Sequence, residues 1–266
     1  MKVAVLGTGN MGRALIVGLK KAYSEKVSIV AFDQIEKSLS GLDVQVLQPH
    51  DWFTDENIPD VVIIAVKPSE IGNALLAFSS VNNAEKIKPL WISIAAGVSI
   101  ISLQNHFPTG ARICRVMPNI AVLVGEGMSA YSLNTNCQEE DQHTVETVFN
   151  AVGKSVSVPE KQMNAITGLS GSGPAYVYLF IEALIEGGVT AGLSYATARE
   201  CALQTVSGAA RMVSETGENP NTLKTKVMSP AGTTACGLLA LEAHAFKHTV
   251  ISAVVDATRR SEQLGA

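Results

Sequence analysis

Two glycine-containing segments of the sequence are suited to binding anionic groups through main-chain N–H groups. The first, VAVLGTGNMGRAL, places Gly7, Gly9 and Gly12 in G-x-G-x-x-G spacing, after an apolar run and at the start of a helical pattern. In this spacing the first glycine allows a tight turn, the second lets the backbone approach a pyrophosphate, and the third lets the helix pack closely. The phosphates then meet free N–H groups at the helix N-terminus. The segment predicts a dinucleotide site, and a glycine-rich turn without a ligand is the alternative.

The second segment, SPAGTTACGLLALE, has a loop of small residues in front of an apolar, helical run. Pro230 sets the angle of the loop, and Gly232 permits close approach of a ligand. The N–H groups of Gly232, Thr233 and Thr234 at the start of that helix are expected to bind a carboxylate, with help from the helix dipole. Helix capping is the alternative, because Ser and Thr are preferred N-cap residues.

Two charged side chains follow apolar runs that are expected to be strands near the glycine loop, residues 7–12. Asp33 closes VSIVAFD, where a carboxylate would accept hydrogen bonds from a ribose 2′-OH and repel a 2′-phosphate. This favours NAD over NADP, although Asp33 could instead cap the next helix. Lys67 in AVKPSEI ends another strand at the same sheet edge, where Pro68 fixes the turn. Lys67 could face a cofactor or a substrate carboxylate, or lie in solvent.

The first half of the chain contains the elements that must position these segments. The runs KVAVLG, VSIVAFD, VVIIAV, LWISIAAG and ARICRVMP are rich in β-branched residues, and Gly, Asp or Pro closes most of them. Continuous apolar runs such as VVIIAV predict strands buried on both faces, as in a parallel sheet covered by helices. Strands and helices in alternation predict an α/β fold with an N-terminal Rossmann-type, doubly wound sheet.

The second half has a different composition, rich in Ala, Leu, Gly and Glu from Asn164 onward, and predicts three or more helices. The change of amino-acid composition near Pro159 predicts two domains. Residues 1–158 would form the dinucleotide-binding domain, and residues 159–266 an all-helical domain for dimerisation and substrate binding.

The composition restricts the classes of partner. Hydrophobic residues make up 47% of the 266 residues and charged residues 17%, below the quarter that is usual in soluble domains. Much of the surface is therefore expected to be buried, for example between subunits. The formal net charge of −4 gives no support for a nucleic-acid or anionic-membrane partner.

The N-terminus, apolar runs, cysteines and histidines favour a cytoplasmic protein without a metal or a membrane span. The opening MKVAVLG does not have the pattern of a signal peptide, and Glu182 and Glu186 interrupt the run AYVYLFIEALIEGG. The four cysteines are scattered without a C-x-x-C pair, as expected of reduced thiols. His244 and His248 lie four apart on an expected helix face, but no third metal ligand is nearby.

The whole chain resembles the pyrroline-5-carboxylate reductase family. The resemblance is carried by GTGNMG (7–12), AVKP (65–68), SIAAGVS (93–99), RVMPN (115–119), GEGMSAY (125–131), TGLSGSGPAY (167–176) and SPAGTT (229–234). It implies a Rossmann domain followed by a helical domain that intertwines with its copy in an obligate homodimer, which assembles into a decamer in many relatives. This agrees with the nearly all-apolar helix expected at 175–185, which needs a partner surface.

The resemblance also implies the reaction, which is reduction of the C=N bond of 1-pyrroline-5-carboxylate by NADPH or NADH to give L-proline. The threonine that matches Thr234 lies near the substrate nitrogen in the family, and we expect it to orient the substrate while water supplies the proton. Glu160 and Thr167 match positions near bound substrate, with a surface charge and a core hydroxyl as alternatives. The predicted substrate site comprises Glu160, Thr167, Val227, Ser229, Ala231, Gly232, Thr233 and Thr234, with Thr234 as the catalytic residue.

The predicted cofactor site combines the glycine loop with residues that follow three further strands. It comprises Gly7, Thr8, Gly9, Asn10, Met11, Gly12, Asp33, Ala65, Val66, Lys67, Pro68, Ala95, Ala96 and Gly97. In TGLSGSGPAY, Ser172 is expected to be an N-cap with Pro174 in the first helical turn. Gly171 and Gly173 would then allow tight packing.

The sequence departs from the family pattern at three places. Ala231 replaces a glycine of the usual SPGGTT, so we expect an ordinary backbone conformation there, because φ > 0 would cost alanine about 1 kcal/mol. Ile120 and Ala121 replace the threonine and proline of MPNTPALV. Asp33 lies where many NADPH-preferring relatives have Ser, Asn or Arg.

Two other functions are compatible with parts of the sequence. A 3-hydroxyacid dehydrogenase shares GxGNMG, but it uses a catalytic lysine on the helix after a glycine-rich segment, and residues 174–193 contain no lysine. A non-catalytic NAD(P)-sensing protein would not need the carboxylate-binding loop. Turnover of the cyclic imine would distinguish the reductase from both.

Overall fold

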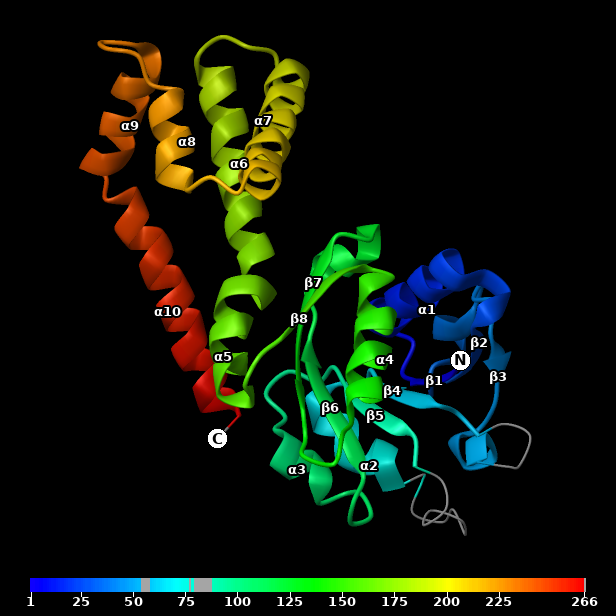
Figure 1. Ribbon diagram of the computed structural model, residues 1–266. Coiled ribbons are helices and arrows are strands. Elements are labelled where there is room, and N and C mark those ends of the chain that lie inside the picture. Colours follow the sequence, from blue (N-terminus) through cyan, green and yellow to red (C-terminus); the bar gives the residue numbers. More distant parts are fainter. Residues whose placement is uncertain (54–57, 77, 79–87, 266) are drawn as a thin grey trace. The chain divides into compact units, whose positions relative to one another are not determined.

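The computed structural model describes residues 1–53, 58–76, 78 and 88–265 in two compact units (Figure 1). The first unit comprises Met1–Ser172 and Asp256–Ala266, and the second comprises Gly173–Val255.

The first unit is built on an eight-stranded sheet with the order β3-β2-β1-β4-β5-β6-β7-β8. The strands from β3 to β6 pair in parallel, β6 and β7 pair antiparallel, and β7 and β8 pair in parallel again. The strands are β1 (Lys2–Leu6), β2 (Ser28–Phe32), β3 (Gln45–Val46), β4 (Val61–Ile64), β5 (Leu90–Ser93), β6 (Arg112–Met117), β7 (Gly127–Leu133) and β8 (Gly153–Ser157).

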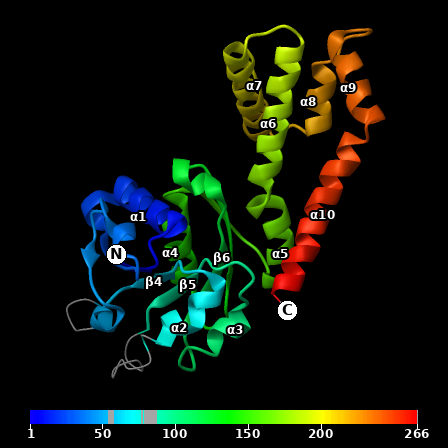
Figure 2. The same cartoon turned by 180° about the vertical axis from the view of Figure 1, so that it is seen from behind.

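Hydrophobic cores cover both faces of this sheet. On one face, residues such as Val3 and Ile63 pack with Leu15 of α1 (Asn10–Tyr23) and Phe149 of α4 (Glu139–Asn150). On the other face, residues such as Val62 pack with side chains of α2 (Ile71–Leu76) and α3 (Ile100–Gln104). The continuous apolar strands therefore have the burial on both faces that the sequence predicted, and Figure 2 shows the second face with α2 and α3.

The predicted fold class is confirmed, and each of the five apolar runs contains one of the strands β1, β2, β4, β5 and β6. The sequence did not predict β3, β7 or β8. The last of these, GKSVS, is an edge strand with only half-buried or exposed residues. It therefore lacks the apolar residues by which a buried strand is identified in a sequence.

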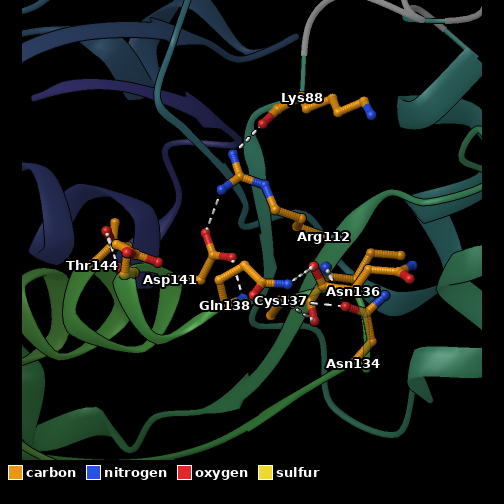
Figure 3. Close-up of polar contacts among 10 residues, drawn as sticks. Lys88, Arg112, Asn134, Asn136, Cys137, Gln138, Asp141 and Thr144 are labelled. Carbon is orange, nitrogen blue, oxygen red and sulfur yellow. Dashed lines mark hydrogen bonds and ion pairs between the residues drawn. The ribbon is translucent and has the colours of Figure 1, made fainter.

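A polar network joins β6, β7 and α4 at the amino ends of the central strands, the sheet edge opposite the glycine loop (Figure 3). Arg112 Nη1 donates to Asp141 Oδ1 at 2.7 Å, and Arg112 Nη2 donates to the Lys88 carbonyl. Asn134 donates to the Ala111 carbonyl at 2.8 Å and accepts from the Ile113 N–H at 3.1 Å. Asp141 is 3% exposed and also closes the capping box of α4, so the network secures the antiparallel end of the sheet.

The first unit continues past Pro159, where the sequence suggested the domain boundary. It includes α5 (Met163–Ile166) and the end of α10 (Phe246–Leu264), which meet where the Ser261 hydroxyl donates to Asn164 Oδ1 at 2.9 Å. Because these helical segments pack together, compactness divides the chain after Ser172, and the domain boundary at residue 159 stays a prediction.

Ser172 is not the N-cap that the sequence suggested. A π-helical turn, Thr167–Gly171, joins α5 to α6 (Gly173–Thr190), and the Ser172 N–H donates to the Thr167 carbonyl at 2.8 Å. Helical hydrogen bonding thus continues through this point, and no helix start is created that a side chain would have to cap. Such π turns are frequent at functional sites.

The second unit is a helical bundle that leaves much apolar surface exposed. On α6, Val177, Tyr178 and Leu179 are 45–66% exposed, whereas only Ile185 of this helix is buried. One copy of the chain therefore does not bury the apolar helix. The remaining helices of this unit are α7 (Tyr195–Thr216), α8 (Pro220–Lys226), α9 (Thr233–Ala243) and the first part of α10.

The two histidines that the sequence placed on one helix face do not share a helix. His244 is the C-cap that follows α9, Ala245 has φ 54°, and His248 belongs to α10. Among the described residues, no group of three or more His, Cys, Asp or Glu side chains could hold a metal ion. No single helix in that same part of the chain is long and apolar enough to cross a membrane. By length and composition only, α9 and α10 pass this test together, bent by 50°.

Candidate active site

The glycine loop has the close contacts that its spacing predicts. Gly7 has φ 96°, and a Cβ atom there would lie 2.8 Å from the Ala65 carbonyl group. A Cβ atom on Gly12 would overlap the Gly7 carbonyl oxygen, so α1 packs directly on the loop. By contrast, a Cβ atom on Gly9 would have no atom within 4 Å from the described residues beyond its chain neighbours, so this position faces open space.

The start of α1 offers free main-chain donors beside that open space. Gly9 is the N-cap, and no side chain among the described residues caps the helix. The first hydrogen bond of the helix runs from the Arg13 N–H to the Gly9 carbonyl at 2.9 Å. The N–H groups of Asn10, Met11 and Gly12 precede that bond and carry the positive end of the helix dipole. These residues fit the pyrophosphate of a dinucleotide.

Asp33, at the end of β2, is held tightly against the glycine loop. Its Oδ2 accepts from the Thr8 N–H at 2.6 Å and from the Thr8 hydroxyl at 3.2 Å, and its Oδ1 accepts from the Ile35 N–H at 2.8 Å. The carboxylate therefore binds both the loop before α1 and the turn that follows β2.

The other predicted cofactor residues lie, like the glycine loop, at the carboxyl ends of the parallel strands. Ala65–Pro68 follow β4, and Ala95–Gly97 follow β5, both of which run parallel to β1. Lys67 is exposed, and Ala95 is buried. The end of α10 approaches this edge as well, because a Cβ atom on Gly265 would lie 2.9 Å from the Gly97 carbonyl oxygen.

Glu160 and Thr167, which were predicted to contact substrate, both form hydrogen bonds with other residues of the protein. Glu160 Oε1 accepts from the Ile100 N–H at 2.7 Å and from Nη1 of the buried Arg115 at 3.2 Å. The Thr167 hydroxyl donates to the Met163 carbonyl at 2.8 Å. Glu160 thus ties the start of α3 to β6. Sequence reasoning did not single out Arg115, although a cation within the apolar strand RICRVM needs a buried partner.

The loop before α9, in the second unit, contains a tight turn. The Gly232 N–H donates to the Ser229 carbonyl at 3.0 Å, with Pro230 and Ala231 between them. Ala231 has φ 57°, so the expectation of an ordinary conformation was wrong. A turn with Pro at its second position and φ > 0 at its third is of type II, which normally has Gly or Asn there. The hydrogen bond and Pro230 impose this conformation on alanine.

The first turn of α9 supplies a different set of three free donors from the one that the sequence suggested. The Gly232 N–H closes the turn, so it is not available to a ligand. The first hydrogen bond of the helix runs from the Cys236 N–H to the Gly232 carbonyl at 3.3 Å, which leaves the N–H groups of Thr233, Thr234 and Ala235 ahead of it. Within the described part of the chain, the Thr234 hydroxyl has no hydrogen-bond partner. Val227, at the end of α8, is 69% exposed.

Substitution Ala231→Gly should stabilise the protein by about 1 kcal/mol. Glycine removes a left-handed alanine that costs about 1–2 kcal/mol, and the larger freedom of the unfolded glycine chain offsets part of this gain. Urea unfolding would measure the difference. The matched variant Ala240→Gly, inside α9, should lose about 1 kcal/mol. Equal losses in both variants would contradict the assignment of strain to Ala231.

Comparisons with known proteins cover the whole chain. Residues 160–264 match a family model described as pyrroline-5-carboxylate reductase dimerisation, and residues 2–97 match one described as NADP oxidoreductase, coenzyme F420-dependent. The pyrroline-5-carboxylate reductase of Synechocystis is 41% identical, with 100% of this chain and 98% of the relative covered. That of Arabidopsis thaliana is 40% identical, with 99% and 95% covered. The chain belongs to the pyrroline-5-carboxylate reductase family.

Solved structures of this family also match the fold. The Plasmodium falciparum pyrroline carboxylate reductase with NADP bound has a TM-score of 0.85 at 33% identity, with 100% of both chains covered. The Coxiella burnetii pyrroline-5-carboxylate reductase has a TM-score of 0.88 at 31% identity, with 99% of this chain and 98% of that chain covered. The resemblance found in the sequence is therefore confirmed.

Proposed function

We propose that the protein reduces the C=N bond of 1-pyrroline-5-carboxylate to give L-proline, with a nicotinamide cofactor as reductant. The observation that carries the proposal is the identity of 41% and 40%, over 100% and 99% of this chain, to two proteins named pyrroline-5-carboxylate reductase. The free main-chain N–H groups at the starts of α1 and α9 support it, because the reaction needs both a site for the dinucleotide and a site that binds the carboxylate of the ring.

The protein's task in this reaction is mainly to bind and orient. The N–H groups of Thr233 and Thr234 bind the ring carboxylate, and the dipole of α9 strengthens this grip. The Thr234 hydroxyl, which has no hydrogen-bond partner among the described residues, hydrogen-bonds at the ring nitrogen and fixes the orientation of the imine. A bound reduced nicotinamide supplies the hydride. The protonated imine already carries the positive charge that hydride transfer removes, so water suffices as the proton source.

An assay with purified protein tests this proposal directly. Racemic 1-pyrroline-5-carboxylate is added with NADH or NADPH, and cofactor oxidation and proline formation are followed together. We expect stoichiometric formation of proline. Tight binding of NADH or NADPH without turnover would favour a cofactor-sensing protein. Oxidation of 3-hydroxyacids without imine reduction would favour the dehydrogenase alternative.

We further propose that the functional unit is a homodimer formed by the second unit, in a cytoplasmic protein. The exposed apolar side chains of α6 support the dimer, because they need a surface to cover them, and residues 160–264 match a dimerisation model. Four free cysteines support the location. Light scattering would give the mass in solution and distinguish the dimer from a decamer, and a monomer would contradict the proposal.

Asp33 favours NADH over NADPH in this proposal. Its carboxylate accepts from the ribose 2′-OH, and its negative charge repels a 2′-phosphate. Substitution Asp33→Ser should therefore raise the ratio of kcat/KM with NADPH to kcat/KM with NADH at least tenfold. Steady-state kinetics with both cofactors would measure the ratio. An unchanged ratio would mean that Asp33 does not contact the ribose.

A further inference from the structure

Thr8 makes two hydrogen bonds to one oxygen of the Asp33 carboxylate. Its N–H donates to Oδ2 at 2.6 Å and its hydroxyl donates to the same atom at 3.2 Å. Thr8 itself is 2% exposed, so its side chain is held in the packed loop between β1 and α1. Water therefore competes poorly for these bonds, and the Thr8 hydroxyl gives Asp33 a fixed partner.

The Ile35 N–H holds the other oxygen, Oδ1, at 2.8 Å. Three donors thus fix the rotation of the Asp33 carboxylate. An ionised carboxylate has about four acceptor positions, so one position remains for a hydroxyl donor from a ligand. A fixed carboxylate with one open acceptor position favours a hydroxyl and opposes a phosphate more strongly than a carboxylate that can turn away.

We propose that Thr8 is a positioning residue for cofactor choice, which acts by holding Asp33 against the 2′ position of the adenosine ribose. The inference rests on the proposed contact between Asp33 and that ribose. It adds that the side-chain hydroxyl of a residue within the glycine loop determines how strongly Asp33 excludes a 2′-phosphate.

The Thr8→Val substitution removes the hydroxyl and keeps the shape of the side chain. The Asp33 carboxylate then keeps its two main-chain donors but loses its side-chain donor, and a methyl group faces Oδ2. The carboxylate can rotate away from a 2′-phosphate, so NADPH should bind better relative to NADH. We expect the ratio of the NADPH to the NADH dissociation constant to fall about tenfold, the usual effect of one hydrogen bond to a charged group.

Binding titrations without substrate test this inference. NADH and NADPH fluorescence is titrated with the wild-type protein and with the variants Thr8→Val, Thr8→Ser and Asp33→Ser. Thr8→Ser keeps the hydroxyl and should stay close to the wild-type ratio. Thermal unfolding in the absence of cofactor shows whether each variant is folded.

The double variant shows whether Thr8 acts through Asp33. If it does, Thr8→Val should have no further effect on the ratio in an Asp33→Ser background. An effect of equal size in both backgrounds would overturn the inference, as would a Thr8→Val variant that weakens both cofactors equally. If Asp33→Ser alone leaves the ratio unchanged, the proposed contact of Asp33 with the ribose fails, which is a different outcome from failure of the Thr8 inference.

Discussion

Substitution of Gly12 by alanine should weaken NADH binding at least a hundredfold. The added methyl group would overlap the Gly7 carbonyl oxygen and would lie 3.2 Å from the Ala65 Cβ atom. Main-chain atoms cannot rotate aside, so α1 must move away from the loop. The free N–H groups at the start of α1 then leave the position at which they bind a pyrophosphate. Overpacking of this kind also lowers stability, by about 1–3 kcal/mol.

Two other glycines provide controls for this prediction. Gly9→Ala places a methyl group in open space, so it should block the pyrophosphate without loss of stability. Gly72→Ala, in α2, makes only an ordinary contact of 3.7 Å with His106 and should bind NADH normally. Fluorescence titration and thermal unfolding measure both properties. Normal binding by the Gly12→Ala variant would show that the start of α1 does not hold the cofactor.

The central parallel strands could be predicted because they are buried on both faces and therefore read as continuous apolar runs. The antiparallel end of the sheet could not be predicted in the same way. β7 has the sequence GMSAYSL, in which two serines are buried, and β8 is an edge strand with polar side chains. Their positions depend on the pairing of β7 with β6 and on the Arg112 network, which are contacts between distant parts of the chain.

The same difference between local patterns and tertiary contacts applies to the residues of the candidate site. The glycine spacing and an acid at the end of β2 are local patterns, and they predicted the loop and Asp33. The contact of Thr8 with Asp33 joins residues 25 positions apart, so no local pattern contains it. The pairing of Glu160 with Arg115 is likewise tertiary. At Ala231 local preference predicted the wrong sign of φ, because the turn between Ser229 and Gly232 overrides it.

Substitution Thr234→Ala should lower kcat about 10- to 100-fold and change KM for the imine much less. The main-chain N–H that binds the carboxylate remains in this variant, so substrate still binds. The lost hydroxyl is the group proposed to orient the ring nitrogen, and a hydrogen bond to a charged group is worth about 1.5–3 kcal/mol. The loss should appear in kcat, because orientation matters most as the reacting atoms approach.

Steady-state kinetics with 1-pyrroline-5-carboxylate and saturating cofactor measure this effect, with Thr234→Ser as the matched variant. Serine keeps the hydroxyl and loses only a methyl group, so it should recover most of the wild-type kcat. If both variants lose the same activity, the methyl group and its packing matter, and the orienting role fails. If Thr234→Ala has the wild-type kcat, the hydroxyl has no part in the reaction. The amides of α9 would then be the whole contribution of this loop, and its task would be confined to holding the carboxylate.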